Sequence, residues 1–285
     1  MHTAIVADST CDLSPELIER YNIHIVPLHV LLGDKEYRDG VDVTAQEIFA
    51  WSDEHKETPR TSAPSIDDAA SVMRPLLDAG NELICFGISE TMSSSCNVMR
   101  LAAKELKAED RVHVINSMNL STGIGHLVIE AAEMAKVGKD PDEIVSEIEA
   151  LIPRVRASFI IDTLTYLHRG GRCSGLAALV GGALKLHPRI NVIDGSMQPG
   201  LKYRGKPSHY IKAYVDSLSP EIDSAKPDRV FITHSHADPE IVAEVRKYLE
   251  GMNHFNEIFE TYAAGVVSSH CGPGTLGVLF IAQDE

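Results

Sequence analysis

The chain has 285 residues, of which 44% are hydrophobic and 24% are charged, and this composition is ordinary for a globular protein. Its length predicts roughly two domains, each able to bury a core of its own. The formal net charge of −15 argues against a general affinity for nucleic acid or an acidic membrane, because both attract proteins with a positive field. We expect no nucleic-acid partner and at most transient membrane contact.

Five cysteines are spread over the chain without a CxxC pair, at positions 11, 85, 96, 173 and 271. An odd number of isolated cysteines favours reduced thiols over a disulfide framework. The sequence starts without a basic segment followed by a long apolar stretch. It also contains no apolar run of the roughly 18 residues that a membrane span needs. We therefore expect a cytoplasmic protein.

The first half alternates between strand-like and helix-like segments. Thr3 to Ala7 is a short apolar run typical of a buried parallel strand, and Ser14 before Pro15 is typical of a helix N-cap. The later segments are a strand over 23–32, a helix capped at 42–44 and reaching 51, a loop over 56–65, helices over 66–77, 95–106, 121–135 and 141–156, and strands over 82–88 and 111–115. This alternation predicts a parallel sheet covered on both faces.

The second half has another order of elements. The charged turn from Arg169 to Arg172 precedes an expected helix over 174–186, whose small and aliphatic residues must be buried or line something apolar. Asp194-Gly195 is a strong hairpin signal between two short strands. The expected strands lie over 189–193, 200–203, 229–234 and 275–282, and the helices over 208–218 and 239–249. We expect an α/β protein with a parallel α/β domain over 1–157 and an α+β domain with a mixed sheet over 158–285.

Two clusters of hydroxyl side chains, Thr61-Ser62 and Ser93-Ser94-Ser95, are candidates for an anion site. The second cluster follows a strand-like run, and His270 stands in a Gly/Pro-rich turn near the C-terminus. Hydroxyls and helix-opening amides can hold a carboxylate without a metal, because charge-assisted hydrogen bonds are stronger than neutral ones. If these segments meet in space, the sequence predicts the binding of a small anion without chemistry.

A serine hydrolase is one alternative, in which Ser93 would act with His270. The nucleophile-elbow pattern GxSxG is not met, since the segment from Gly87 to Thr91 lacks the final glycine. Hydroxyls that open a helix are also more often caps than catalysts. The segment from Asp8 to Asp12 lacks the second aspartate that an aspartate-nucleophile motif carries two residues after the first, so we favour a turn that caps the next helix.

A metal hydrolase is the other alternative, in which His234, His236 and Asp238 would hold an ion. Such sites carry a histidine directly after the aspartate, where this chain has Pro239. An Asp-Pro pair is better interpreted as the N-cap and first turn of a helix. No Walker motif occurs, and no GxGxxG follows a strand. We expect neither a metal nor a cofactor.

Five motifs occur in order along essentially the whole chain and are placed as in the DegV family. They are Asp8-Ser9 with Asp12, Thr61-Ser62-x-Pro64-Ser65, Ile88-Ser89 with Met92-Ser93, Tyr166-Leu167-x-Arg169-Gly170-Gly171-Arg172, and His270-x-Gly272-Pro273-Gly274-x-x-Gly277. The chain therefore resembles the DegV family of fatty-acid-binding proteins. It is similar to the binding subunits of bacterial fatty acid kinase.

The resemblance implies that a long-chain fatty acid lies between the two domains as a ligand. In the kinase systems such a protein is not the catalyst. It presents the carboxylate to a separate ATP-dependent kinase, and the resulting acyl phosphate enters phospholipid metabolism. The residues implied are Thr61, Ser62, Ser93 and His270 at the carboxylate, and Arg172 and Arg204 near the head group or on a kinase-facing side.

The chain departs from the family pattern beside this site. The family usually continues Ser-Gly-Thr-Tyr, whereas this chain has the run from Ser93 to Cys96. The missing glycine reduces backbone freedom, and the small Cys96 in place of an aromatic residue predicts a tunnel of altered shape. Arg189 also stands where an aliphatic residue is usual.

Overall fold

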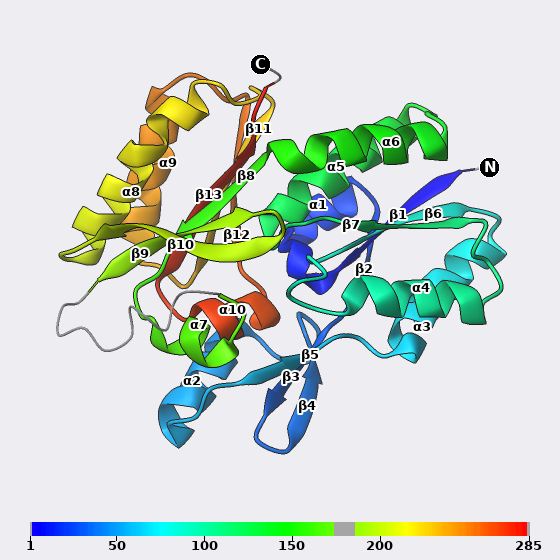
Figure 1. Ribbon diagram of the computed structural model, residues 1–285, viewed down its shortest axis with the longest axis horizontal. Coiled ribbons are helices and arrows are strands. Elements are labelled where there is room, and N and C mark those ends of the chain that lie inside the picture. The colour runs from blue at the N-terminus through cyan, green and yellow to red at the C-terminus, as the bar shows by residue number, and fades with distance from the viewer. Residues whose placement is uncertain (1, 174–185, 284–285) are drawn as a thin grey trace.

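The computed structural model describes residues 2–173 and 186–283. Its first sheet is parallel, with the strand order β2-β1-β6-β7 (Figure 1). The strands are β1 (Thr3–Asp8), β2 (Ile23–Val26), β6 (Glu82–Gly87) and β7 (Val112–Asn116). Along β1, Ile5 and Val6 belong to different hydrophobic cores, because successive side chains point to opposite faces. The sheet is therefore buried on both faces, as the alternation of elements predicted.

Helices cover both faces of this first sheet, and hydroxyl side chains cap several of them. Ser14 and Ser65 cap the helices that follow them, and Ser65 accepts a hydrogen bond from the backbone N–H of Asp68 at 3.0 Å. One face carries α3 (Ile66–Asp78) and α4 (Ser95–Glu105), and the other carries α1 (Pro15–Arg20), α5 (Thr122–Lys136) and α6 (Pro141–Leu151). The short 3-10 helix η1 (Ser9–Cys11) follows β1 directly.

The second sheet is mixed, with the strand order β10-β9-β8-β13-β11-β12. Its strands are β8 (Val155–Ile160), β9 (His187–Ile193), β10 (Ser196–Tyr203), β11 (Arg229–Ser235), β12 (Glu257–Tyr262) and β13 (Thr275–Ile281). The β11–β12 pair is parallel, and the other pairs of this sheet are antiparallel. The expected hairpin at Asp194-Gly195 is confirmed, because it joins β9 to β10 with both residues at positive φ.

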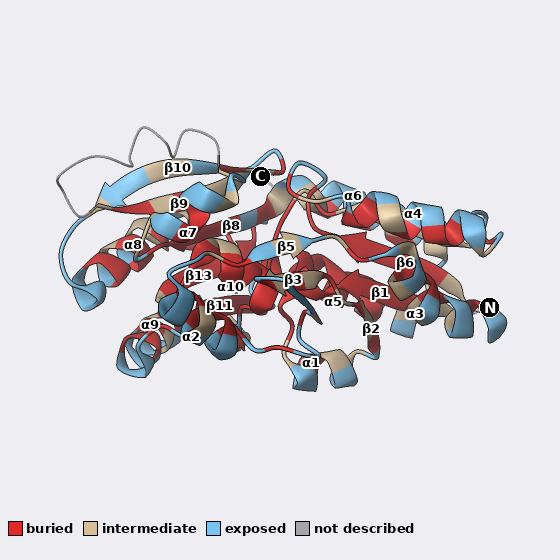
Figure 2. Cartoon of the chain, turned by 90° about the horizontal axis from the view of Figure 1, so that it is seen from below, coloured by how far each residue is buried: buried red, intermediate tan, exposed pale blue. Residues whose placement is uncertain are grey.

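Two long helices lie side by side on the outer face of the mixed sheet (Figure 1). They are α8 (Pro207–Ile222) and α9 (Pro239–Gly251). Helix α5 of the first half packs against the other face, where it contacts β8 and β13. Figure 2 shows the inner strands of the two larger sheets mainly in the colour of buried residues, whereas the edge strand β10 is mostly exposed or intermediate. Among the described residues, no helix is both long and apolar enough to cross a bilayer.

A third, small sheet with the order β4-β3-β5 was not expected from the sequence. Its strands are β3 (His29–Leu32), β4 (Lys35–Arg38) and β5 (Arg60–Ser62). It lies beside three helices, α2 (Ala45–His55), α7 (Thr165–Gly170) and α10 (Gly265–Cys271). In Figure 1 these elements form one group below the two larger sheets. This group brings a segment of the first half against helices of the second.

Several expected boundaries were wrong. The strand expected over 23–32 is two strands in different sheets, interrupted at Pro27, which lacks the N–H that a continuing ladder needs. The loop expected over 56–65 contains β5, whose pairing with β3 no local pattern announces. The helix expected to reach residue 156 ends at Leu151, and the turn η2 (Ile152–Arg154) leads into β8 instead.

The structure does not test the predicted domain boundary or the predicted small-residue helix. The predicted domain boundary between residues 157 and 158 falls inside β8 and stays a prediction. The small-residue helix predicted over 174–186 falls on residues 174–185, which lie outside the described part of the chain. The two-domain α/β architecture itself is confirmed, with one parallel and one mixed sheet.

Candidate functional site

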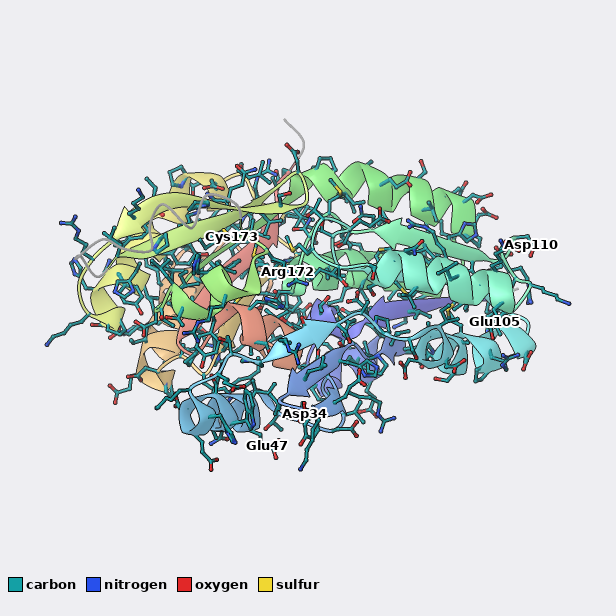
Figure 3. The ribbon with its side chains drawn as sticks, turned by 60° about the horizontal axis from the view of Figure 1, so that its bottom comes forward. Asp34, Glu47, Glu105, Asp110, Arg172 and Cys173 are labelled. Atoms are coloured by element: carbon teal, nitrogen blue, oxygen red, sulfur yellow. The ribbon has the colours of Figure 1, made fainter. Side chains whose placement is uncertain are left out.

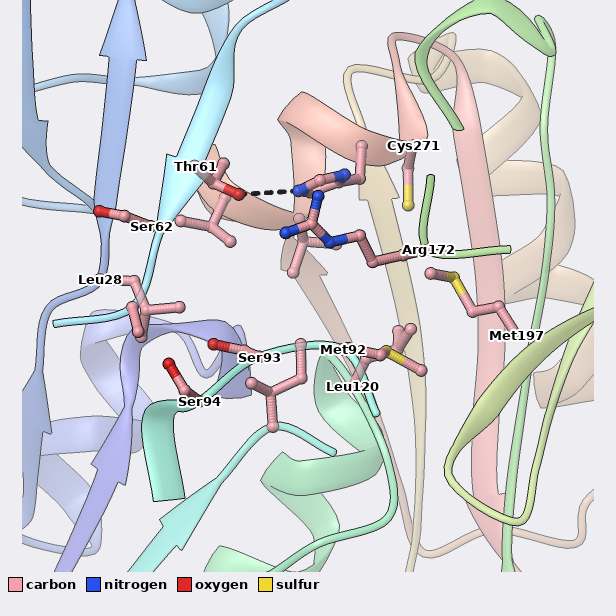
Figure 4. Close-up of a pocket in the computed structure, with 15 residues that line it drawn as sticks. Leu28, Thr61, Ser62, Met92, Ser93, Ser94, Leu120, Arg172, Met197 and Cys271 are labelled. Carbon is pink, nitrogen blue, oxygen red and sulfur yellow. Dashed lines mark hydrogen bonds between the residues drawn. The ribbon is translucent and has the colours of Figure 1, made fainter. Parts of the chain in front are cut away.

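A cavity of about 130 Å³ lies where the two halves meet the small sheet. Figure 3 shows Arg172 near the middle of the molecule, at this junction, and Figure 4 shows the lining in close-up. The predicted residues that line the cavity are Thr61 and Ser62 of β5, Ser93 before α4, and His270 of α10. The fold thus gathers hydroxyls and a histidine that lie far apart in sequence, and their role as ligands stays a prediction.

Thr61 and His270 are joined by a hydrogen bond of 2.8 Å between Oγ1 and Nε2, across 209 positions of sequence (Figure 4). Burial, with a smaller contribution from Arg172, lowers the pKa of His270 to about 4, so the ring is neutral at pH 7. A neutral ring with its proton on Nε2 donates to Thr61, and the Thr61 hydroxyl is then free to donate to an anion. Nδ1 has no hydrogen-bond partner among the described residues.

His270 was expected in a turn, but it lies in the last turn of helix α10. The start of that helix is held by two buried carboxylates from the first half of the chain. Asp12 accepts the backbone N–H of Ala264 at 2.8 Å, and Asp39 accepts that of Val266 at 3.2 Å. The first backbone N–H groups of a helix have no acceptor within the helix, so these carboxylates accept their hydrogen bonds instead. The position of His270 therefore depends on residues of the other half.

The remaining oxygens of the two carboxylates are also bonded. Ser9 donates to Asp39 at 2.8 Å, and Ser121 donates to Asp12 at 2.5 Å. Burial raises the pKa of Asp39 to about 6, and burial raises that of Asp12 well above its usual range. Sequence reasoning assigned Asp12 no contact with α10, because nothing local indicates a partner so far along the chain.

Asp8 has the capping role that the sequence predicted. Its carboxylate accepts the backbone N–H of Thr10 at 3.1 Å and so caps the 3-10 helix η1. Its other oxygen accepts the N–H of Ile88 at 2.9 Å, just after β6. This bond ties the ends of β1 and β6 together beside the cavity, where Ile88 is part of the lining.

The Gly-Gly pair of the charged turn has a packing role. A Cβ at Gly170 would lie 2.3 Å from Nδ1 of His270, so only glycine lets α7 approach α10 this closely. Gly171 follows with φ of +66° and ends the helix in the left-handed conformation. Gly170 therefore packs against the ring of His270, whose Nε2 is bonded to Thr61.

Helix α4 begins at Ser95 with Ser94 in the N-cap position, but the Ser94 side chain makes no capping bond. The hydroxyls of Ser93 and Ser94 line the cavity instead, near the positive end of the helix dipole (Figure 4). Cys96 is fully buried, and a Cβ at Gly87 would lie 2.5 Å from its sulfur. It packs against β6 and is not among the described residues that line the cavity, and its effect on the shape of a tunnel stays a prediction.

The two candidate arginines differ in position. Arg172 lines the cavity beside His270 and donates to the backbone oxygen of Gly170 at 2.7 Å (Figure 4). Arg204 is exposed after β10 and is not among the described residues of the lining. Of the two, Arg172 is therefore the one placed to meet an anion in this cavity.

The rest of the lining is mainly apolar. It includes Met92, Leu120 and Met197, together with Val267 and Cys271. A smaller cavity of about 20 Å³ shares Leu120, Val267 and Cys271 with it and continues between the sheets. The site is thus amphipathic, because hydrogen-bond donors and apolar side chains line the same cavity.

The two enzymatic alternatives can be compared with the contacts of the described residues. His270 bonds Thr61, and no hydrogen bond joins it to Ser93 among the described residues. Within the same part of the chain, no group of three His, Cys, Asp or Glu side chains is arranged to hold a metal ion. Asp238 accepts the backbone N–H of Glu240 at 2.9 Å and caps α9, which confirms the helix-start interpretation.

The fold and this cavity define a two-domain α/β protein with an amphipathic site between its halves. A family model described as "Uncharacterised protein, DegV family" matches residues 2–283, and the chain belongs to the DegV family. A DegV domain-containing protein of Deinococcus radiodurans is 32% identical over 284 residues, covering 98% of each chain.

Two solved structures are similar over nearly their whole length. A DegV family protein from Thermus thermophilus, described by its fatty acid binding, has a TM-score of 0.91 at 30% identity, covering 99% of this chain and 100% of that one. A stearic-acid-binding protein from Eubacterium ventriosum has a TM-score of 0.85 at 28% identity, covering 99% and 98%. The resemblance stated from the sequence motifs is thus confirmed at the level of the family.

Proposed function

We propose that this protein binds a long-chain fatty acid in the cavity between its halves. The proposal depends on one observation above all, the amphipathic lining, in which Thr61, Ser93 and a neutral His270 share a cavity with apolar side chains. Fatty acid binding by relatives of this fold supports it. The ligand is a carboxylate with a long apolar tail, and no cofactor takes part.

The head group is held by hydroxyl donors in this proposal. Thr61 and Ser93 donate to the carboxylate, and His270 orients the Thr61 hydroxyl through their 2.8 Å bond. Ser62 lines the same cavity, but its hydroxyl points away from Thr61 (Figure 4), because consecutive side chains of a strand lie on opposite faces. Arg172 at the cavity supplies the compensating positive charge. Hydrogen bonds to a charged group contribute roughly 1.5–3 kcal/mol each, which is enough to fix the orientation of the ligand.

The tail supplies most of the affinity. Each buried methylene is worth roughly 0.8 kcal/mol, so a tail of about fifteen contributes on the order of 12 kcal/mol before ordering costs. Leu120 and Met197 belong to the apolar part of the lining, and Leu120 also lines the smaller cavity between the sheets. We place the start of the tail there, directed toward the smaller cavity.

Mass spectrometry of lipid extracted from the purified protein tests the ligand class, and a stoichiometric long-chain acid is expected. Thr61→Val removes the hydroxyl while keeping the shape, and should lower affinity by roughly ten- to hundred-fold. Thr61→Ser keeps the hydroxyl and is the matched control. The absence of acyl species, together with no binding of added fatty acid, would refute the proposal. Unchanged affinity of Thr61→Val would refute only the assignment of the head group.

We propose further that the protein is not itself the catalyst and presents the carboxylate to a separate fatty acid kinase in the cytoplasm. Exposed Arg172 beside the proposed head group supports an open face there. The test compares ATP consumption by a bacterial fatty acid kinase with and without the loaded protein. Acyl phosphate formed only when both are present is the expected result. Ester hydrolysis by this protein alone, abolished in Ser93→Ala, would favour the hydrolase instead.

A further inference from the structure

The hairpin formed by β9 and β10 lies between two cavities. Val192 pairs with Met197 across the hairpin, and Met197 lines the proposed fatty-acid cavity, where it is only 3% exposed. Asn191 and Ile193 point to the opposite face, because successive side chains of a strand alternate. There they line a second cavity of about 540 Å³, together with residues of β8 and the end of α8. The hairpin thus covers the fatty-acid cavity with one face and has open space behind the other.

The outer part of this hairpin has few backbone pairings with the rest of the mixed sheet. The ladder between β8 and β9 ends at the pair of Ser158 and Asn191, although both strands continue beyond it. β10 is an edge strand of the sheet, and its outer side makes one isolated bridge among the described residues, from Met197 to Cys173. Beyond Asn191 the hairpin is therefore only loosely joined to the sheet.

The pairing within the hairpin is interrupted at the same level. β9 and β10 are in regular register from the turn to the pair of Ile190 and Pro199, and the register then shifts between Pro199 and Lys202. An irregularity of this kind disrupts the local ladder and bends the strand. Ile190 directly precedes Asn191, where the ladder to β8 ends, so both interruptions cross the hairpin along one line. The outer part of the hairpin, residues 191–198, can therefore bend there as a unit.

The tip of the hairpin contacts the loop that leads to Ser93. Thr91 donates a hydrogen bond of 2.5 Å to the backbone oxygen of Gly195, and the hydroxyl of Ser196 lies 3.5 Å from that of Thr91. Gly195 has φ of +74°, and a Cβ there would lie 2.6 Å from the hydroxyl of Ser89. Thr91 is exposed, so water can replace its bond to the tip at little cost. The tip therefore fits closely against the first half, through a bond that opens easily.

We propose that residues 191–198 form a flap, which opens to admit the fatty acid and closes over its tail. This inference rests on the proposed function and adds the regulation of that site. When the bond from Thr91 breaks, the flap swings into the space behind it and takes Met197 away from the fatty-acid cavity. A long apolar tail needs such an opening, because Met197 shields the cavity from solvent while the flap is closed.

A disulfide that can be formed and reduced tests the flap within a single protein. The hydroxyls of Thr91 and Ser196 are 3.5 Å apart, so cysteines at both positions are within reach of a disulfide. The variant combines Thr91→Cys with Ser196→Cys. It also carries Cys173→Ser, because Cys173 bridges to the residue after Ser196 and would compete for the new thiol. Oxidation locks the flap, and reduction releases it without the native bond from Thr91.

Alkylation of a native cysteine measures the opening without any lipid. Cys271 lines the cavity on the same side as Met197 and is 4% exposed, so iodoacetamide reaches it when the flap opens (Figure 4). Cys85 is fully buried in the parallel sheet and is not among the described residues of either lining, so it reports global unfolding. We expect Cys271 to react about ten-fold faster in the reduced than in the oxidised variant, with Cys85 equally slow in both.

A single substitution tests the same bond without a disulfide. Thr91→Val keeps the shape of the side chain and removes the hydrogen bond to Gly195. It should speed both the alkylation of Cys271 and the release of bound fatty acid by about two- to ten-fold, the effect of one neutral hydrogen bond. Thr91→Ser keeps the hydroxyl and is the matched control, with the rates of the wild type expected.

The outcomes separate this inference from the proposed function. Slower transfer of stearic acid from the oxidised variant to phosphatidylcholine vesicles, restored by reduction, supports the flap. Equal rates of Cys271 alkylation in the oxidised and reduced variant overturn it, and so does a parallel rise for Cys85, which would show global unfolding. A wild-type protein that binds no stearic acid refutes the proposed function, whereas the alkylation rates still decide whether the cavity opens by this flap.

Discussion

His270 is the residue that sets the chemistry of the site. Because burial lowers its pKa to about 4, the ring is neutral at pH 7 and serves as a hydrogen-bond partner of Thr61. Arg172, which is exposed, provides a positive charge at the cavity. In the proposed complex with a fatty acid, a charge at the surface avoids the cost of burying a cation, and the hydroxyls inside position the ligand.

Gly170→Ala tests whether the ring position matters. The added Cβ would lie 2.3 Å from Nδ1 of His270, so the ring must move away and its bond to Thr61 must lengthen or break. We expect fatty acid affinity to fall by about ten-fold, the value of one hydrogen bond to a charged group. Overpacking should also lower the free energy of unfolding by about 1–3 kcal/mol. Calorimetry and urea unfolding measure the two effects.

Gly251→Ala is the matched control for this change. Gly251 is likewise the last residue of its helix, α9, but no atom lies within 4 Å of a Cβ placed there. It should leave both affinity and stability nearly unchanged. Wild-type affinity in Gly170→Ala would mean that the position of His270 does not affect the ligand.

At the scale of elements, α10 shows how a weak helix is held in place. Its sequence, GVVSSHC, contains a glycine, two valines and two serines, which are poor helix formers. A helix of seven residues is also too short to be stable alone. Asp12 and Asp39 accept hydrogen bonds from the backbone N–H groups at its start, and Val266 packs with the small sheet. The helix therefore exists because the rest of the fold provides its partners.

Asp39→Asn tests the carboxylate that anchors α10. Burial raises the pKa of Asp39 from 3.8 to about 6. Between about pH 3.8 and pH 6 the Asp39 carboxyl group is therefore protonated in the folded protein and ionised in the unfolded chain. The resulting stability is fully present below about pH 3.8 and is lost as the pH rises through 6. The free energy of unfolding of the wild type, relative to Asp39→Asn, should therefore increase by up to about 3 kcal/mol from neutral pH to about pH 4.

Urea titrations of both proteins over this pH range give the difference directly. Asp34→Asn is the control for the loss of one carboxylate at an exposed position, since Asp34 lies in the turn between β3 and β4. A difference between the wild type and Asp39→Asn that does not change with pH would contradict a buried carboxylate at position 39.

Some of these elements could be predicted from the sequence, and others could not. The parallel sheet followed from alternating apolar runs and capped helices, and the hairpin followed from Asp194-Gly195, because both signals are local. The small sheet and α10 depend on pairings between distant segments, such as β3 with β5. The hydroxyl clusters were visible as residue types, but their meeting with His270 required the carboxylates that hold α10.

At the scale of the whole molecule, the two halves share one hydrophobic core. Ile5 and Phe86 of the parallel sheet belong to the same cluster as Phe231 and Leu279 of the mixed sheet, with α5 between them. A buried ion pair crosses the same boundary, since Arg229 of β11 donates to Glu130 of α5 at 2.7 Å. The two large sheets therefore have separate strand pairings, but their side chains pack into one core. The cavity is lined in part by residues of that core.

This shared core predicts that the halves unfold together, although a chain of this length often unfolds in steps. Trp51 is the single tryptophan and lies in α2 against the small sheet, so its fluorescence reports that group, whereas far-UV circular dichroism reports all helices. In urea, with lipid removed, we expect the two transitions to coincide, because α10 links the small sheet to the shared core through Val266 and Val267. A fluorescence transition at lower urea would show instead that the small sheet opens first and exposes Thr61 while the large sheets remain folded.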